Sequence, residues 1–220
     1  MYVRPLRNAE PPIIPRARLG QFLEDVFHNH DELYRHHRAL VDKLHHIQRE
    51  EHPRIRSITA VIFDAALNFR EAYMEYIPNY PIAAYRIDEE MATNTAFKAF
   101  VNVSLCFYRG INTLLMCYPQ NAVRHPDAHR LDMKSFINRP IPRLLRYELL
   151  LKNILTETPS YHEDRSAIPP VFELIKVLGK ETEPGVASAK QKVELWKFNS
   201  NLVFKPGEYV VSDEECQAYI

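Results

Sequence analysis

The sequence predicts an all-α protein, and three observations support this fold class. The 220-residue chain contains only 5 glycines, few for a protein rich in β-strands or tight turns. Apolar residues recur at helical spacings of three, four and seven along most of the chain. The longest such pattern, Leu131 to Thr158, has apolar residues on more than one side and arginines among them. We therefore expect this helix both to pack in a core and to present a docking surface.

The remaining elements follow from apolar periodicity and from the positions of proline and glycine. Polar residues interrupt the first helical pattern at HNHDE, residues 28–32, and NYPIAAY, residues 79–85, predicts a turn with a short extended piece. SYHEDRSAIPP, residues 160–170, is expected to be a loop, and Gly185 permits a kink. LVF and YVV flank a PGE turn after residue 201, which predicts the start of β structure. Helical patterns cover residues 15–51, 53–77, 88–100, 131–158 and 171–180.

The composition restricts the classes of function. Lys+Arg and Asp+Glu are 28 each, so no overall basic excess indicates nucleic-acid binding. Three cysteines without a CxxC motif fit free thiols in a reducing compartment. No apolar stretch approaches the ~18 residues of a membrane span, and the N-terminus lacks a secretory pattern. We expect a soluble, cytoplasmic protein.

Two groups of residues could indicate a function, a metal site for the histidines and base stacking for the aromatic residues, but their spacing favours a structural role. Histidines are frequent between His28 and His46, but without HExxH or ligand-spaced cysteines they favour a solvated helix surface, with His37 half-buried, over a metal site. Phe69, Tyr73 and Tyr76 recur at helical spacing, which favours core packing over base stacking. No motif for covalent catalysis is present, and we expect neither cofactor nor metal.

Residues 102–123 differ abruptly from the rest of the chain. They contain two of the three cysteines and no acidic residue, and Arg109 is their only charge, whereas the whole chain is 25% charged. This segment could be a buried helical hairpin. Our hypothesis is that it is an atypical insertion, such as a retained intron or an error in the gene model.

FINRPIPRLLRYELLLKNIL, within 131–158, closely resembles the signature helix of the Dbl homology domain, the catalytic module of Rho-family guanine-nucleotide exchange factors. VRPLRN…FLEDVFHNHDELYRHHRAL and RIRSITAVIFDAALNFREAYMEYIPNY are similar to other parts of this domain. TEPGVASAKQKVELW and NLVFKPGE look like the exit of the domain and the entry to a pleckstrin homology domain in fungal members. The resemblance covers most of the chain outside 102–123.

The resemblance implies an elongated helical bundle over residues 1–200, followed over 201–220 by a linker and the truncated start of a pleckstrin homology domain. It implies a guanine-nucleotide exchange factor for a Rho-type small GTPase, acting without covalent chemistry in fungal cell-wall and actin regulation. It implies no nucleic-acid partner. Recruitment to the plasma-membrane cortex would depend on the pleckstrin homology domain, of which the chain contains only the beginning.

The resemblance also assigns GTPase-binding residues. Arg146 stands where the family has a Lys or Arg that engages the acidic switch II region, and a guanidinium can pair bidentately with a carboxylate. Pro142 stands where many members carry Gln. Glu183 lies near a position that contacts switch II. The expected binding set is Pro142, Arg143, Arg146, Leu149, Leu150, Asn153 and Glu183.

Two departures from the family pattern lower the expected activity. The family's first conserved region supplies a Glu that contacts switch I, and this chain is expected to lack that region. Losing one partner of an interfacial charge pair costs roughly 2–5 kcal/mol. Pro142 has no backbone N–H and could kink the helix. We therefore expect weak exchange by residues 1–220, with a GTPase-binding scaffold of impaired activity as the alternative.

Overall fold

The computed structural model describes residues 2–102 and 132–202, and all regular structure within them is helical. The all-α prediction is therefore confirmed for this part of the chain. The expected insertion at 102–123, apart from residue 102, and the expected β start after residue 202 lie outside the described residues. The helices are α1 Val3–Asn8, α2 Arg16–Phe27, α3 His30–Glu50, α4 Thr59–Asn68, α5 Arg70–Thr93, α6 Thr95–Asn102, α7 Met133–Asn138, α8 Pro140–Glu157, α9 Asp164–Glu181 and α10 Glu183–Asn201.

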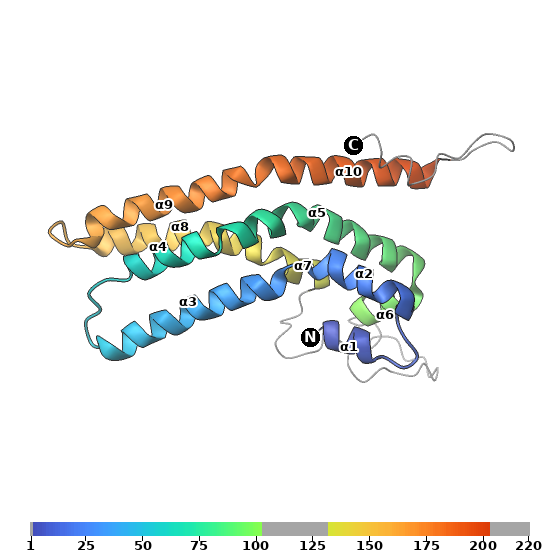
Figure 1. The fold of residues 1–220 in the computed structure, drawn as a ribbon, viewed down its shortest axis with the longest axis horizontal. Coiled ribbons are helices and arrows are strands. Elements are labelled where there is room, and N and C mark those ends of the chain that lie inside the picture. The colour runs from blue at the N-terminus through green and yellow to red at the C-terminus, as the bar shows by residue number, and fades with distance from the viewer. Residues whose placement is uncertain (1, 103–131, 203–220) are drawn as a thin grey trace, which may run out of the picture.

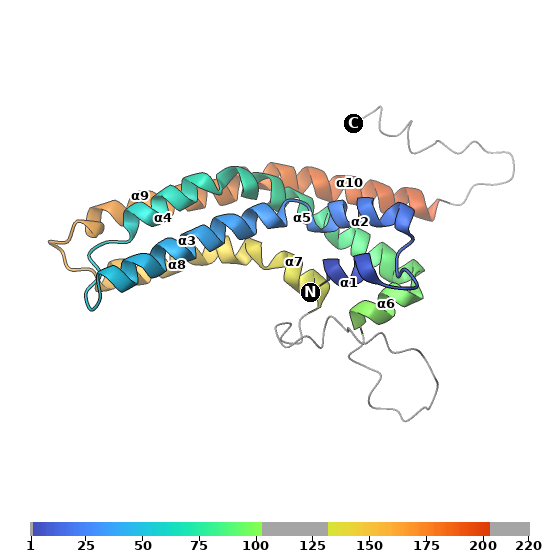
Figure 2. The same ribbon diagram turned by 60° about the horizontal axis from the view of Figure 1, so that its bottom comes forward.

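The helices form an elongated bundle, and α5, α9 and α10 extend along its long axis (Figure 1). Helices α3, α4, α8 and α9 lie together at one end, whereas α1, α2, α6 and α7 lie at the other (Figures 1 and 2). Helix α10 runs along α5 on the side away from α1. Helix α5 therefore connects the two ends.

Two apolar cores correspond to these two ends. The larger core contains Tyr73 of α5 and Phe69, the residue between α4 and α5, together with buried residues of α3, α4, α8 and α9. The smaller core contains Ile87 of α5 and buried residues of α1, α2, α6 and α7. Phe69, Tyr73 and Tyr76 are each at most 5% exposed, so the aromatic stripe is core, as the sequence predicted.

The boundaries of the middle helices differ from the sequence-based expectation. Residues 53–58 precede α4 and are not helical, so the prediction that Pro53 starts a helix was wrong. Residues 79–85 lie inside α5, so the predicted turn with an extended piece was also wrong. Pro78 and Pro81 lie inside α5, where each removes a backbone N–H and thereby favours a kink. Helix α5 is bent near its middle (Figure 1).

The signature stretch divides into two helices rather than one. The Asp132 side chain accepts a hydrogen bond from the Ser135 N–H and caps the start of α7. Helix α8 begins at Pro140, where a missing N–H costs little. Arg139 between them keeps right-handed helical angles, so the chain changes direction there without a loop.

Residues 164–170 are helical, although the sequence predicted a loop over 160–170. Asp164 is 5% exposed and accepts hydrogen bonds from the Ser57 and Thr59 hydroxyls at 2.5 and 2.7 Å. Ile168 and Val171 are fully buried in the larger core. These contacts come from distant parts of the chain, and they hold the segment in a helix despite Pro169 and Pro170.

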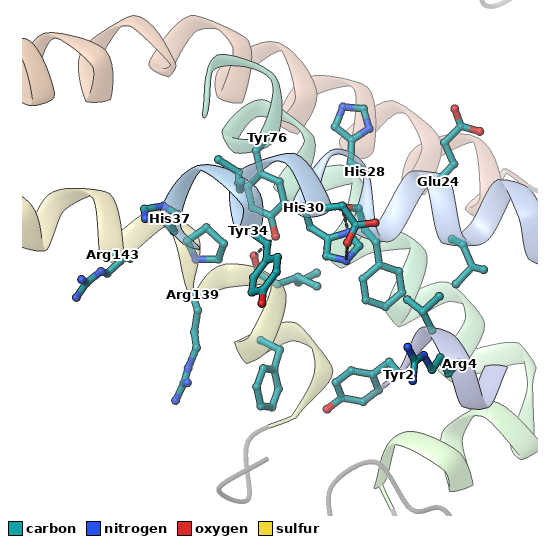
Figure 3. A pocket seen from close by; sticks show the side chains of 18 of the residues that line it. Tyr2, Arg4, Glu24, His28, His30, Tyr34, His37, Tyr76, Arg139 and Arg143 are labelled. Carbon is teal, nitrogen blue, oxygen red and sulfur yellow. Dashed lines mark hydrogen bonds and ion pairs between the residues drawn. The ribbon is translucent and has the colours of Figure 1, made fainter. Parts of the chain in front are cut away.

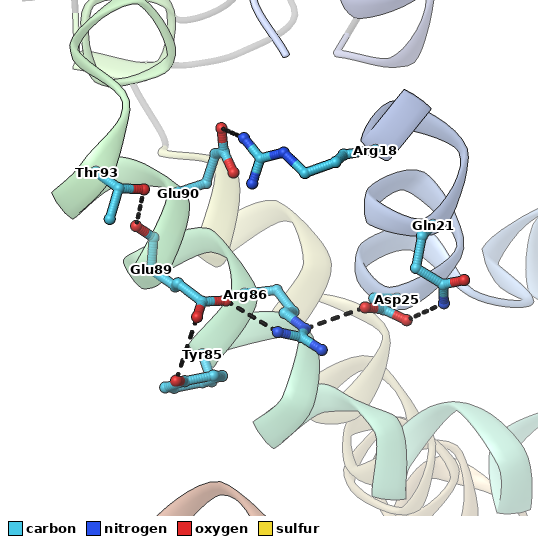
Figure 4. A network of polar contacts seen from close by, with 8 residues as sticks. All are labelled: Arg18, Gln21, Asp25, Tyr85, Arg86, Glu89, Glu90 and Thr93. Carbon is cyan, nitrogen blue, oxygen red and sulfur yellow. Dashed lines mark hydrogen bonds and ion pairs between the residues drawn. The ribbon is translucent and has the colours of Figure 1, made fainter. Parts of the chain in front are cut away.

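A polar network joins α2 to α5 near the smaller core (Figure 4). Arg86 of α5 contacts Asp25 of α2 at 3.1 Å and Glu89 at 2.9 Å. Its guanidinium also lies 4.7 Å from the centre of the Trp196 ring on α10. Arg86 thus links three helices with one side chain, since a guanidinium can hydrogen-bond in its plane and stack on its face.

Gly185 allows α10 to approach α5 closely. A Cβ at this position would lie 2.7 Å from Pro78 Cγ, closer than real Cβ contacts permit. The sequence suggested a kink at Gly185, but the residue lies within the first turn of α10. The absent side chain therefore matters for packing rather than for helix direction.

We expect Gly185→Ala to lower the free energy of unfolding by about 1–3 kcal/mol, because the new methyl group displaces α10 from Pro78. Gly20→Ala is the matched control. A Cβ there meets nothing within 4 Å, so it should raise stability by roughly 0.5–1 kcal/mol through helix propensity. Chemical denaturation of the two variants measures both effects. Equal stabilisation by both substitutions would contradict the packing role of Gly185.

Candidate functional site

One face of α8 is built into the larger core. Leu144, Tyr147 and Leu151 recur at spacings of three and four and are at most 6% exposed. Helix α8 packs along α9, and Gly179 of α9 faces Leu145, with 3.7 Å between its ideal Cβ position and Leu145 Cδ2. The sequence analysis did not single out these three buried residues, because leucines occupy every side of this helix.

The opposite face of α8 is exposed and carries most of the predicted binding residues. A residue separation of 4, 7 or 11 returns to the same side of a helix. Pro142, Arg146, Leu149 and Asn153 therefore lie along one line, directly opposite the buried face. Pro142 is partly buried, and the other three are exposed. Arg143 and Leu150 flank this line and are also exposed.

This stripe combines positive charge with exposed apolar surface. Leu145, Leu149 and Leu150 are 56%, 60% and 45% exposed, an unusual density of large apolar side chains for one helix face. Contiguous apolar surface rimmed by polar groups is typical of protein-binding sites. The expectation that this helix is both core and docking surface is consistent with this arrangement. The division of its faces differs, because Leu149 shares the side of Arg146 and Asn153.

Glu183, the last predicted binding residue, lies on a different helix. It is exposed in the first turn of α10, four residues beyond Gly179. Gly179 itself packs beside Leu145 of α8, so the end of α9 joins this region of the bundle. Nearby Glu181 pairs with Arg70 of α5 at 2.7 Å. Glu183 thus adds a carboxylate close to the α9–α10 junction.

A broad groove of about 1400 Å³ adjoins the N-terminal half of α8 (Figure 3). Residues of α1, α2, α3, α7 and α8 line it, including the exposed ring of Tyr34. Six arginines line the groove against two carboxylates, Glu24 and Asp31. The groove is therefore locally basic although the chain has no net charge. The arginines are Arg4, Arg7, Arg16, Arg139, Arg143 and Arg146.

His37 of α3 joins the groove to the core through two tyrosines. Its Nε2 lies 2.8 Å from the Tyr73 hydroxyl, and its Nδ1 lies 2.9 Å from the Tyr147 hydroxyl. The Tyr73 hydroxyl donates to the Pro140 carbonyl at 3.2 Å. The Arg143 guanidinium lies 4.7 Å from the centre of the Tyr147 ring. The prediction that His37 is half-buried is confirmed.

These surroundings change the ionisation of His37. Burial, then the positive charge of Arg143 and the proximity of His36, lower its pKa from 6.5 to about 4. Burial, assisted by Tyr147, also raises the pKa of Tyr73 well above its ordinary value. Near neutral pH both groups are uncharged, and the hydrogen bonds between them connect neutral partners.

Two other kinds of feature, a metal site and a membrane-spanning helix, are absent from the described residues. Within residues 2–102 and 132–202, no group of three or more His, Cys, Asp or Glu side chains is arranged to hold a metal ion. No helix in the same ranges is both long and apolar enough to cross a membrane. Sequence reasoning did not single out Tyr34 or Arg139 as groove residues, since the groove forms only where separate helices meet.

An elongated helical bundle with a mixed cationic and apolar stripe on one helix defines a class of protein-binding module. The RhoGEF domain family matches residues 1–183, most of the chain, so the chain belongs to this family. The resemblance noted in the signature helix is thereby confirmed.

Curated relatives include fungal exchange factors. The chain is 25% identical over 196 residues to Rho1 guanine nucleotide exchange factor 1 of Schizosaccharomyces pombe, covering 89% of this chain and 13% of that protein. It is 24% identical to Rho1 guanine nucleotide exchange factor 2 of the same organism, covering 94% of this chain and 16% of that protein. The chain thus spans a small part of each relative.

Solved structures share the fold. The DH/PH domains of PDZ-RhoGEF, in a complex with activated RhoA, match with a TM-score of 0.69 at 19% identity, covering 92% of this chain and 51% of that chain. A DH/PH fragment of the same protein in complex with human RhoA matches with a TM-score of 0.69, covering 98% and 55%. The described helices therefore have the Dbl homology fold.

Leu149→Ala should leave the free energy of unfolding within about 0.5 kcal/mol of wild type, because its side chain is outside the core. Leu151→Ala, two residues away, should cost about 2–5 kcal/mol through the cavity it creates. Denaturant unfolding of the two variants measures the difference. A large destabilisation by Leu149→Ala would contradict the conclusion that this face of α8 does not pack against the core.

Stability should depend on pH through His37. Its lowered pKa means that the unfolded chain binds the proton more readily than the folded chain. The stabilisation of the folded chain that comes from this difference is fully present above pH 6.5 and is lost as the pH falls toward about 4. His37→Phe should therefore lose less stability between pH 7 and about 4.5 than wild type does. Parallel denaturation curves for both proteins across this range would contradict the lowered pKa.

Proposed function

We propose that this chain binds a Rho-type GTPase through the exposed face of α8 and accelerates nucleotide exchange. The observation that carries the proposal is the stripe of Arg146, Leu149 and Asn153 on a helix whose other face is fixed in the core. Membership of the RhoGEF family supports it, as do fungal relatives named as Rho1 exchange factors. A solved relative of the same fold is in complex with human RhoA.

The chemistry requires no covalent step. An exchange factor and a nucleotide each lower the other's affinity for the GTPase, and this coupling is reciprocal. Arg146 can pair bidentately with an acidic side chain of the partner, while Leu149 and Leu150 supply apolar contact beside it. The basic groove favours approach by an acidic surface. Exchange is then accelerated in either direction, and the nucleotide concentrations decide which nucleotide is loaded.

Arg146→Glu should lower the rate at which this chain stimulates GDP release from a Rho-type GTPase by roughly 30-fold or more. The reason is that the new carboxylate would face the acidic side chain of the GTPase that Arg146 is proposed to bind. The measurement is stopped-flow release of a fluorescent GDP analogue from the purified GTPase. Thermal unfolding should be nearly unchanged, since Arg146 is exposed.

Arg49→Glu provides the matched control, because Arg49 is an exposed arginine in the last turn of α3 and does not line the basic groove. It should retain the wild-type rate. Equal rates for Arg146→Glu and wild type would contradict the assignment of this face. Absence of release with every Rho-type GTPase would contradict the proposed function.

We also propose that residues from about 201 onward begin a pleckstrin homology domain. The support is the LVF–PGE–YVV pattern and the DH/PH composition of the solved relatives. Such a domain would help to recruit a cytoplasmic protein to the plasma-membrane cortex. Sedimentation with acidic lipid vesicles of a chain extended beyond residue 220, but not of residues 1–202, would support this.

A further inference from the structure

His37 connects three helices through hydrogen bonds that require one protonation state. Tyr73 has a single hydroxyl proton, which it donates to the Pro140 carbonyl. Its oxygen must therefore accept a proton from His37 Nε2–H. In the neutral ring the other nitrogen is then unprotonated, so Nδ1 accepts from the Tyr147 hydroxyl. The result is a directional chain from Tyr147 through His37 and Tyr73 to Pro140.

This series of hydrogen bonds holds α8 at two residues that are seven positions apart. Pro140 is the first residue of α8, and Tyr147 lies two turns further on the same helix. Two attachments on one side of a helix fix its rotation about its own axis. That rotation decides which side chains face outward, so the links to α3 and α5 determine where Arg143 and Arg146 point.

The aromatic rings around His37 reinforce the same geometry. The His37 and Tyr147 rings are parallel within 2°, and the Phe69 ring lies 5.4 Å from His37 at an angle of 23°. Arg143 lies over the Tyr147 ring, so the orientation of that ring sets the position of a cation on the exposed side. His37 itself lines the basic groove together with Arg143 and Arg146.

We propose that His37 is a positioning residue for GTPase recognition, acting through Tyr147 and Tyr73 to hold the exposed face of α8 in its binding orientation. This inference rests on the proposed function. His37 does not itself touch the partner in this role. Its contribution is the alignment of the α8 residues that do.

The test compares two substitutions that separate hydrogen bonding from packing. His37→Phe keeps an aromatic ring in the stack but removes both hydrogen bonds. His37→Gln loses the ring but supplies one acceptor and one donor without charge. His45→Phe, at an exposed position of the same helix, is the control. Each protein is assayed for affinity to the nucleotide-free GTPase and for the rate of GDP release.

We expect His37→Phe to lower GTPase affinity and release rate on the order of tenfold, since small misalignments of positioning groups have large effects. His37→Gln should recover part of that loss, and His45→Phe should match wild type. Activity of His37→Phe within twofold of wild type would overturn the inference. So would greater activity of His37→Phe than of His37→Gln, because that order indicates ring packing alone.

Two further measurements keep the test independent of folding defects and of the proposed function. Tyr73→Phe removes only the hydroxyl between His37 and Pro140. It should lower GTPase affinity and release rate as His37→Phe does, and it replaces His37→Phe in the test if that variant folds poorly. Nitrogen-15 NMR of the wild-type histidine ring should show Nε2 protonated and Nδ1 unprotonated at pH 7, and the reverse tautomer would overturn the inference. A wild-type chain that shows this tautomer but no exchange with any Rho-type GTPase would refute the proposed function and, with it, the role of His37 in GTPase recognition. Wild-type exchange that is unchanged in His37→Phe would refute the inference alone.

Discussion

The two-faced environment of α8 is the constraint on which the rest of the structure depends. Leu144, Tyr147 and Leu151 are committed to the core, so the opposite side of the helix is held outward with little freedom to rotate. A helix that could rotate about its own axis would turn to bury the large apolar residues of that outer side. In the bundle they are held in place, and a binding surface results.

The surrounding helices serve this arrangement in different ways. Helix α9 packs along α8, and α3 and α5 reach it through His37 and Tyr73. Helix α5 also extends into the second core, where Arg86 joins it to α2 and α10. The exposed face of α8 is therefore supported by the whole bundle, as precise recognition by a surface requires.

Sequence reasoning located helices well where apolar periodicity was regular, and it failed where prolines suggested breaks. Within the predicted interruption at residues 28–32, only His28 and Asn29 separate two helices: α2 ends at Phe27, α3 begins at His30, and His28 adopts a positive φ of 44°. Pro78, Pro81, Pro169 and Pro170 instead lie within helices. Buried neighbours such as Ile168 and Val171 outweigh the lost hydrogen bonds, and no local pattern reveals that balance.

The sequence by itself determined the all-α class, the signature helix and the residues of its candidate binding face. These follow from periodicity and from a motif that the chain carries in one continuous stretch. Only the tertiary structure decided which side of that helix is buried, because leucines occur all around it. It also assembled the basic groove and the link from Tyr147 through His37 to Tyr73. The hydrogen bond between His37 and Tyr147 joins residues 110 positions apart, and only the packing of separate helices brings such residues together.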